Sequence, residues 1–105
     1  MVSRGEIHWH EVEEAGRRPV LVLTADALAP VLRRVLVAGL TTTVRGVDTE
    51  VAVGSDDGLP RDGAVNLLDV RGVPAALLVE RLAVLRPDRM RAVWTRWRSP
   101  PDADR

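Results

Sequence analysis

The stretch GRRPVLVL, residues 16–23, decides the fold, because it sets two arginines and a proline before an unbroken apolar run. A short apolar run bounded by glycine and proline is typical of a buried strand. Any strand needs polar ends, so Arg17 and Arg18 have two interpretations. Either they cap the strand in water, or one of them is held at a rim where an anion binds.

Apolar runs of the same kind recur on both sides of this stretch. They predict strands at 6–11, 19–24, 35–40, 47–53, 64–73 and 79–85. Loops rich in glycine and proline separate these runs, above all the segment 54–63. Short strands at such regular spacing predict a mainly β fold, either a small barrel or a curled sheet.

Helical signals are few before residue 87. Single helical turns are expected at 26–31 and 74–78. Pro87 followed by Asp88 predicts the start of a C-terminal α-helix, since proline favours the first helical position and an acid the first turn. One face of that helix carries Met90, Val93, Trp94 and Trp97.

No linker divides the chain. Residues 1–98 are therefore expected to form a single domain, and residues 99–105 a disordered tail. The C-terminal helix also carries a row of arginines: Arg86, Arg89, Arg91, Arg96 and Arg98. Such a row can bind phosphates, but the solvated face of an amphipathic helix is the favoured interpretation.

Composition limits the classes of protein that remain. The chain has 105 residues, which gives it a modest core that a partner subunit would extend. It has no cysteine, so disulfides and thiolate chemistry are excluded. Its formal net charge of zero argues against a non-specific nucleic-acid coat. Neither a signal peptide nor a membrane-spanning run is recognisable, so we expect a cytoplasmic protein.

The motif His8-Trp9-His10 lies on a predicted strand. Alternation puts both imidazoles on one face and Trp9 on the other. The histidines could act as an acid–base pair, bind a metal, or simply occupy a polar face. A metal site needs at least a third ligand, and the chain has no other histidine and no cysteine, so we expect no metal or cofactor.

Three separated pieces could form a rim at one end of the sheet. Arg18 begins one strand, Thr41-Thr42-Thr43 follows another, and Arg61-Asp62 closes a glycine-bounded loop. If the strands are neighbours, a guanidinium and a hydroxyl meet there. Arginine cannot act as a base at working pH, but it can stabilise charge that develops on a phosphorane. A purely structural rim remains the alternative.

The order of these pieces resembles the MazF/PemK family of toxin endoribonucleases. The resemblance covers about residues 3–95, and each of its motifs is weak alone. The matching segments are RGEI (4–7), GRRPVLVL (16–23), VAGLT (37–41), LPRD (59–62), VNL (65–67) with VR (70–71), and ERL (80–82) with LRPDRM (85–90).

This resemblance implies an SH3-like small β-barrel with short helical turns and a C-terminal α-helix, assembled as a homodimer. It also implies metal-independent cleavage of single-stranded RNA at specific sequences. The ribose 2′-hydroxyl attacks the adjacent phosphate and leaves a 2′,3′-cyclic phosphate and a 5′-hydroxyl. A cognate antitoxin would neutralise the protein.

Site residues follow from the same resemblance. The family's catalytic arginine and threonine fall on Arg18 and Thr41. The expected RNA-binding residues are Trp9, Arg17, Thr42, Thr43, Arg61 and Gly63. Trp9 is the one aromatic residue before the helix that could stack on a base, although a role in the core is the favoured interpretation for it.

Two alternatives stay open at this point. The barrel could be a binding module like the CcdB-type toxins, which act on DNA gyrase. It could also be a decayed member that binds its antitoxin but cuts poorly. In support of decay, the segment 11–17 is short for the family, Gly63 stands where serine is common, and Asp69 where glutamine is common.

Overall fold

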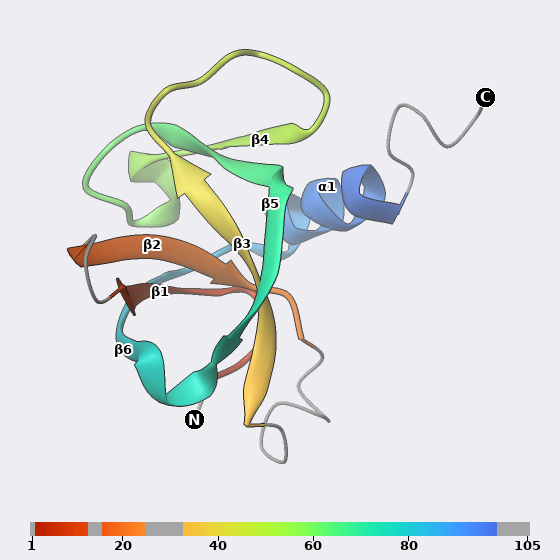
Figure 1. Ribbon diagram of the computed structural model, residues 1–105. Coiled ribbons are helices and arrows are strands. Elements are labelled where there is room, and N and C mark those ends of the chain that lie inside the picture. The colour runs from red at the N-terminus through yellow and green to blue at the C-terminus, as the bar shows by residue number, and fades with distance from the viewer. Residues whose placement is uncertain (1, 13–15, 25–32, 99–105) are drawn as a thin grey trace.

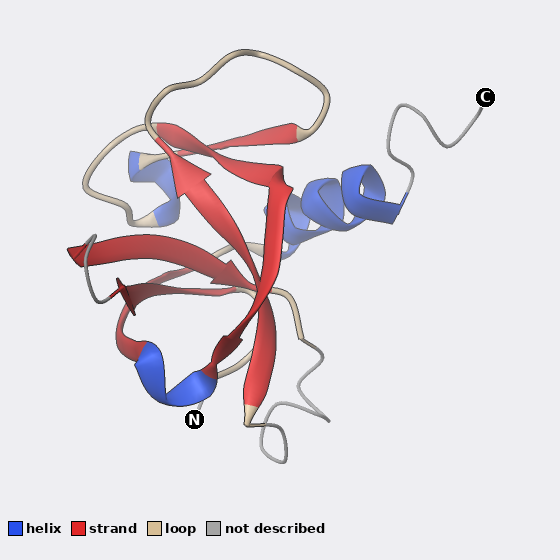
Figure 2. Cartoon of the chain, in the orientation of Figure 1, coloured by secondary structure: helices blue, strands red, loops and turns tan. Residues whose placement is uncertain are grey.

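A computed structural model describes residues 2–12, 16–24 and 33–98. They form one six-stranded antiparallel sheet in the order β4-β5-β3-β2-β1-β6 (Figure 1). Its strands are β1 (Glu6–Val12), β2 (Gly16–Val22), β3 (Arg34–Thr41), β4 (Glu50–Val53), β5 (Gly63–Pro74) and β6 (Leu78–Val84). Two 3₁₀ turns, η2 (Ser55–Asp57) and η3 (Ala75–Leu77), and the helix α1 (Pro87–Arg98) complete the chain (Figure 2).

The predicted mainly β fold with a C-terminal helix is confirmed. The sheet is strongly curled, but its hydrogen bonding leaves β4 and β6 as edges rather than closing a barrel. The turn expected at 74–78 is η3. The turn expected at 26–31 and the tail expected at 99–105 lie outside the described residues.

Two predicted strand starts differ from those observed by three residues, and the other boundaries differ by no more than two. β2 begins at Gly16 instead of residue 19, because Arg17 and Arg18 already pair with Glu11 and His10 of β1. β4 begins at Glu50 instead of residue 47. The segment before it is a turn, in which the Glu50 carboxylate accepts hydrogen bonds from the N–H groups of neighbouring residues.

The sheet wraps around an inner core that α1 closes. Every strand except β6 supplies fully or nearly buried side chains to it, and Val93 of α1 is completely buried there. Met90 and Trp97 pack against the same cluster, which confirms them and Val93 as members of the predicted apolar face. Trp94, the fourth predicted member, is not part of the cluster and meets the ring of Trp97 edge-on. The buried members are Ile7, Leu21, Leu23, Ala38, Val51, Val53, Leu59, Val65, Leu67, Leu85 and Val93.

A second cluster covers the opposite face of the central strands. Val20 and Val22 of β2 lie there with Val35 and Val37 of β3, all nearly inaccessible to solvent. Because strand side chains alternate between faces, each residue of β1, β2 and β3 can be assigned to the inner face or to this second face. By this alternation, the neighbouring residues Arg17 and Arg18 at the start of β2 belong to opposite faces of the strand.

Two arginines of the row at α1 help to hold the helix in place. Arg89 lies 3.3 Å from the fully buried carboxylate of Asp57, and Arg96 donates to the carbonyls of Asp48 and Glu50. The interpretation of the row as the outer face of a packed amphipathic helix therefore accounts for these contacts. No helix among the described residues has the length and apolar character needed to cross a membrane.

Candidate active site

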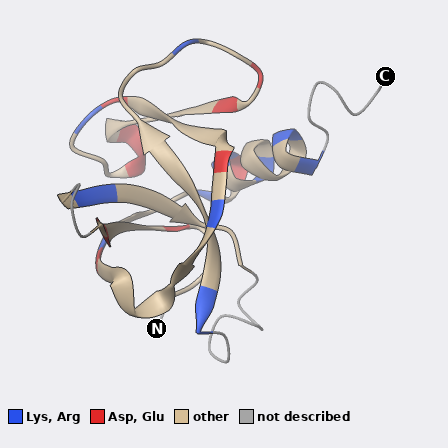
Figure 3. Ribbon diagram, viewed as in Figure 1, with Lys and Arg blue, Asp and Glu red and all other residues tan. Residues whose placement is uncertain are grey.

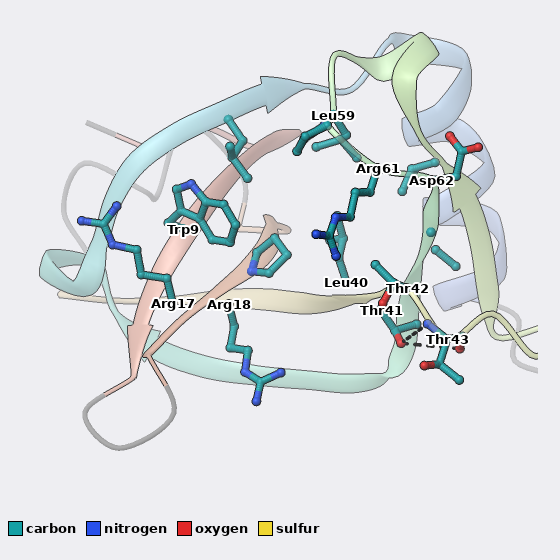
Figure 4. A pocket seen from close by; sticks show the side chains of 16 residues that line it. Trp9, Arg17, Arg18, Leu40, Thr41, Thr42, Thr43, Leu59, Arg61 and Asp62 are labelled. Carbon is teal, nitrogen blue, oxygen red and sulfur yellow. Dashed lines mark hydrogen bonds between the residues drawn. The ribbon is translucent and has the colours of Figure 1, made fainter.

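A cavity of about 680 Å³ opens at the start of β2, where it faces the loop 54–62 (Figure 4). Its wall contains all of the site residues predicted from the sequence: Trp9, Arg17, Arg18, Thr41, Thr42, Thr43, Arg61 and Gly63. Segments far apart in the chain thus meet at one place. Figure 3 shows positive charge at the start of β2 and in the loops above it.

The sheet register explains why Arg18 and Thr41 share this cavity. β2 and β3 pair at Val22↔Val37, Leu21↔Ala38 and Val20↔Gly39, and then the ladder stops. Continued by two residues, the same register sets Arg18 opposite Thr41. Both strands extend past the last pair without bonding, so the two side chains stand at the mouth of the cavity.

Arg17 and Arg18 are both exposed, but they leave β2 in opposite directions (Figure 4). The guanidinium of Arg17 lies 3.4 Å from the Glu80 carboxylate of β6. In the part of the chain that the structure describes, Arg18 has no hydrogen-bond or ion-pair partner. The Arg18 guanidinium is therefore available to an anion, whereas that of Arg17 is partly neutralised.

Trp9 lies on the inner face of β1, on the side of the cavity. It pairs with Pro19 of β2 and with Glu80 of β6, and it is half-buried. Trp9 was predicted to lie on the opposite face of β1 from the two histidines. The structure confirms this, because Trp9 shares the inner face of the strand with the core residue Ile7. A half-buried indole at a cavity wall offers a flat surface for a stacked ring.

The threonines at the end of β3 form a small hydrogen-bonded turn. The hydroxyl oxygen of Thr41 accepts a hydrogen bond from the Thr43 backbone N–H at 3.0 Å. Gly63, the first residue of β5, lies so close that a β-carbon there would collide with the Thr41 carbonyl. Gly63 thus has a packing role at this rim, which permits β5 to approach Thr41.

Sequence reasoning missed the apolar part of the wall and the polar contacts behind it. Leu40, Val53, Leu59 and Leu82 line the cavity, and nothing in their local sequence distinguishes them from core residues. The buried acid Asp57 accepts a hydrogen bond from the Gly54 N–H and so fixes the loop that carries Arg61. Acids bounded by glycines were the available signal for such a turn.

Glu50 fixes the other loop of the rim, residues 42–49. Its side chain is buried, and its carboxylate accepts hydrogen bonds from the N–H groups of Arg45 and Gly46 and from the Arg45 guanidinium. Burial raises the pKa of Glu50, but these hydrogen bonds and the Arg45 charge outweigh it, so the pKa lies below its ordinary value. The charged form therefore stabilises this loop.

The two histidines lie on the second face of β1, each 8% exposed. His8 Nε2 lies 2.9 Å from Glu6 Oε1, whereas no partner of either ring nitrogen of His10 is found among the described residues. Burial lowers the pKa of His10, and the nearby charge of Arg71 lowers it further. The described residues contain no cluster of three histidine, cysteine or acidic side chains that could hold a metal.

An ion pair between Asp69 and Arg71 of β5 crosses the same face. The Asp69 carboxylate covers Gly39, where a β-carbon would collide with it. Gly39 is two residues from Thr41 on β3, so this carboxylate is close to the rim. The negative charge that the sequence places at residue 69 is thus offset locally by Arg71.

Comparison with known sequences gives a consistent set of relatives. The profile of a family described as PemK-like, MazF-like toxin of type II toxin-antitoxin system matches residues 3–98. The protein named probable endoribonuclease MazF5, from Mycobacterium tuberculosis strain H37Rv, is 54% identical over 95 residues, covering 89% of this chain and 86% of that protein.

Solved structures agree with the sequence matches. The Mycobacterium tuberculosis toxin MazF-mt6 is 33% identical with a TM-score of 0.80, covering 88% of this chain and 91% of that one. An endoribonuclease in complex with its cognate antitoxin from a mycobacterial species is 26% identical with a TM-score of 0.85, covering 94% and 93%. The family match, at residues 3–98, includes the strands that form the cavity.

Proposed function

Because this chain belongs to the PemK-like, MazF-like family of toxins of type II toxin-antitoxin systems, we propose that it is an endoribonuclease that cuts single-stranded RNA at specific sequences. The observation that carries the proposal is the shared cavity, whose mouth holds Thr41 and Arg18, an arginine without a partner among the described residues. The relatives named endoribonucleases support the reaction class.

The reaction is attack of the ribose 2′-hydroxyl on the adjacent phosphate without a metal, which leaves a 2′,3′-cyclic phosphate and a 5′-hydroxyl. Arg18 stabilises the negative charge that grows on the phosphate oxygens, since its guanidinium is already at the rim and needs no reorganisation. Thr41 donates to or orients the same oxygens. Splaying of the strand across the rim brings the 2′-oxygen into line with the phosphorus.

Sequence preference comes from the cavity beside this rim. An unstacked base enters the apolar space and stacks on Trp9, while Arg17 and Arg61 contact the flanking phosphates or base edges. Thr42, Thr43 and Gly63 supply hydroxyl and backbone contacts at the opposite wall. The cavity is large enough for a nucleobase, because ligand sites typically start at about 300 Å³.

The partners follow from the family. We propose that the protein is a homodimer in the cytoplasm, where its RNA substrate is found, and that a cognate antitoxin covers the cavity. A solved mycobacterial endoribonuclease of similar fold is bound to such an antitoxin. An antitoxin segment that fills the cavity would exclude RNA by competition, and acidic residues in it would complement Arg17, Arg18 and Arg61.

A cleavage assay tests the proposal. The purified protein is incubated with a long single-stranded RNA in excess EDTA, and the new ends are mapped chemically. We expect cuts at a defined short sequence with cyclic phosphate ends, and none in double-stranded RNA or single-stranded DNA. Arg18→Ala protein prepared in the same way controls for contaminating ribonuclease.

Two results would count against it. If the folded protein cuts no RNA, the result would favour one of the two alternatives, a binding module or a decayed enzyme. Cleavage that EDTA abolishes, or that leaves linear 3′-phosphates from the start, would contradict the 2′-hydroxyl mechanism.

A further inference from the structure

The proposed reaction needs a proton acceptor that Arg18 and Thr41 do not provide. The 2′-hydroxyl must lose its proton as it attacks, and a positioned base typically accelerates such a step by about 10²- to 10⁴-fold. Arginine stays protonated at working pH, and a threonine hydroxyl is far too weak a base. Histidine is the side chain that ordinarily exchanges protons near neutrality, and the chain has two.

The register of the sheet puts one of these histidines beside Arg18. His10 of β1 pairs directly with Arg18 of β2. The β2–β3 ladder stops at Val20↔Gly39, and extending its register by two residues sets Thr41 opposite Arg18. By strand alternation, the three side chains then share one face. Directly opposite side chains in antiparallel strands have β-carbons about 4.5–5.5 Å apart, so His10 is the immediate neighbour of the phosphate-binding arginine.

The other histidine, His8, has a structural role. His8 Nε2 is hydrogen-bonded to Glu6, whose second carboxylate oxygen lies 3.4 Å from Arg81 of β6. His8 thus helps to join β1 to β6 at its other end. His8 pairs with Val20 of β2, which in turn pairs with Gly39 of β3. It is therefore two residues away from the position on β1 that faces Arg18.

Among the described residues, His10 has no partner comparable to Glu6. The Nδ1 atoms of His8 and His10 are both buried without a hydrogen bond, so the two histidines differ at Nε2. The Nε2 atom of His10 has no partner among the described residues and, unlike Nδ1, is not completely buried. Buried polar atoms in native proteins are nearly always satisfied, and an exception asks for an explanation such as a catalytic role. Since no group in the described part of the chain fixes the tautomer, Nε2 is available to accept a proton.

We propose that His10 is the general base of the RNA cleavage, accepting the 2′-hydroxyl proton at Nε2 while Arg18 binds the scissile phosphate. This inference rests on the proposed function. The direction of the Arg18 side chain is consistent with it: Arg18 points away from Trp9 and Arg17, on the face that His10 shares (Figure 4). The nucleobase would lie in the cavity and the scissile phosphate on the other side of β2.

The step balances without a further reactant. The 2′-oxygen forms its bond to phosphorus as its proton moves to His10, and the bond from phosphorus to the 5′-oxygen breaks. The 5′-oxygen takes a proton from water, and the imidazolium of His10 returns its proton to solvent. The products are the cyclic phosphate and the free 5′-hydroxyl.

The surroundings of His10 keep it in the form that a base requires. Burial lowers its pKa and the Arg71 charge lowers it further, so the ring is neutral at pH 7. Arg18 faces it from β2, while on β5 Arg71 is itself paired with Asp69. From β6 its paired residue is Leu78, which is uncharged. The rate should therefore fall on acidification with a midpoint below 6.5, the ordinary histidine value.

The test is a pH–rate profile of three proteins in single-turnover cleavage: wild type, His10→Gln and His8→Gln. We expect His10→Gln to lower the rate about 10²- to 10⁴-fold and to lose the acidic limb of the profile. Added imidazole should restore part of that rate. His8→Gln, which can still bond to Glu6, should keep both the rate and the limb.

Binding and folding are measured in parallel. Affinity is determined with an RNA that carries a 2′-deoxyribose at the cleavage position, and it should be the same for wild type and His10→Gln. Thermal unfolding shows whether each variant is folded, and His10→Asn replaces the glutamine variant if that one is not. Unchanged affinity with a lost acidic limb separates a base from a residue that only supports the sheet.

The outcomes are distinct. A wild-type profile with no acidic limb below 6.5 overturns the proposal even if both variants unfold. A His10→Gln protein that cuts at the wild-type rate, or one that is slow yet keeps the limb and ignores imidazole, overturns it as well. In these cases RNA cleavage by wild type still stands, whereas a wild type that cuts no RNA removes the proposed function itself.

Discussion

Arg17 and Arg18 are adjacent, equally charged and both exposed, yet they belong to two different surroundings. Arg17 is on the side of Trp9, the apolar cavity and Glu80, which partly neutralises it. Arg18 is in the row of His10 and Thr41 and has no partner in the described part of the chain. The alternation of a single strand thus separates a surface suited to recognise a base from one suited to act on a phosphate.

The comparison is tested most directly by removing each arginine in turn. Arg18→Ala should lower the cleavage rate about 10²- to 10³-fold, since loss of one preorganised donor costs about 3–4 kcal/mol in the transition state. Arg17→Ala removes the same charge one residue away and should mainly raise KM. Single-turnover kinetics across RNA concentrations separates the two effects, and equal losses of rate in both variants would contradict the division.

Thr41→Ala should have the next largest effect. Hydrogen bonds to charged groups contribute about 1.5–3 kcal/mol, so we expect the rate to fall about 10- to 150-fold. Thr41→Ser keeps the hydroxyl and should cut nearly as fast as wild type. If the alanine and serine variants are equally slow, then packing of the threonine methyl, and not its hydroxyl, explains the loss.

Trp9→Ala tests the other side of β2. Stacking of a base on an aromatic ring contributes about 1–3 kcal/mol, so KM should rise about 5- to 150-fold while the maximal rate changes little. Trp9→Phe retains a flat ring and should recover most of the affinity. Mapping of cut sites in both variants shows whether sequence preference relaxes, and an unchanged site pattern in Trp9→Ala would assign Trp9 to the core alone.

The smallest expected effect lies outside both surroundings, at Glu50. Its folded-state pKa is lowered, so the charged carboxylate adds stability above the unfolded pKa, and that stability is lost as pH falls through the folded value. Glu50→Gln should therefore lower the melting temperature at neutral pH, with the gap to wild type closing under acid. Thermal melts at several pH values check this, and a constant gap would refute the assignment.

Local sequence was sufficient for most of the fold. Each strand was predicted because its apolar run is short and bounded by turn residues, and α1 because Pro87 and Asp88 mark its start. The start of β4 was placed too early, since Val47 looks like a strand residue. The conformation of this segment is set instead by hydrogen bonds from the N–H groups of Arg45 and Gly46, just before Val47, to the Glu50 carboxylate, contacts that no local pattern reveals.

The candidate site depended on the family resemblance and on topology together. The resemblance selected Arg18 and Thr41, and the register between β2 and β3 explains their meeting at one rim. The position of His10 could not be predicted in the same way. Its nearness to Arg18 requires knowing that β1 and β2 pair at this particular register, and the charge of Arg71 reaches it from a distant strand.

The pairing of β1 with β6 has a consequence for how the protein is made. β1 is translated first, yet one of its two neighbours in the sheet ends at Val84. At about 5–20 residues per second, synthesis of the intervening chain takes several seconds. Non-local pairing of this kind is also intrinsically slow. A nascent chain therefore has an incomplete sheet and an unformed cavity until β6 has been synthesised and has left the ribosome.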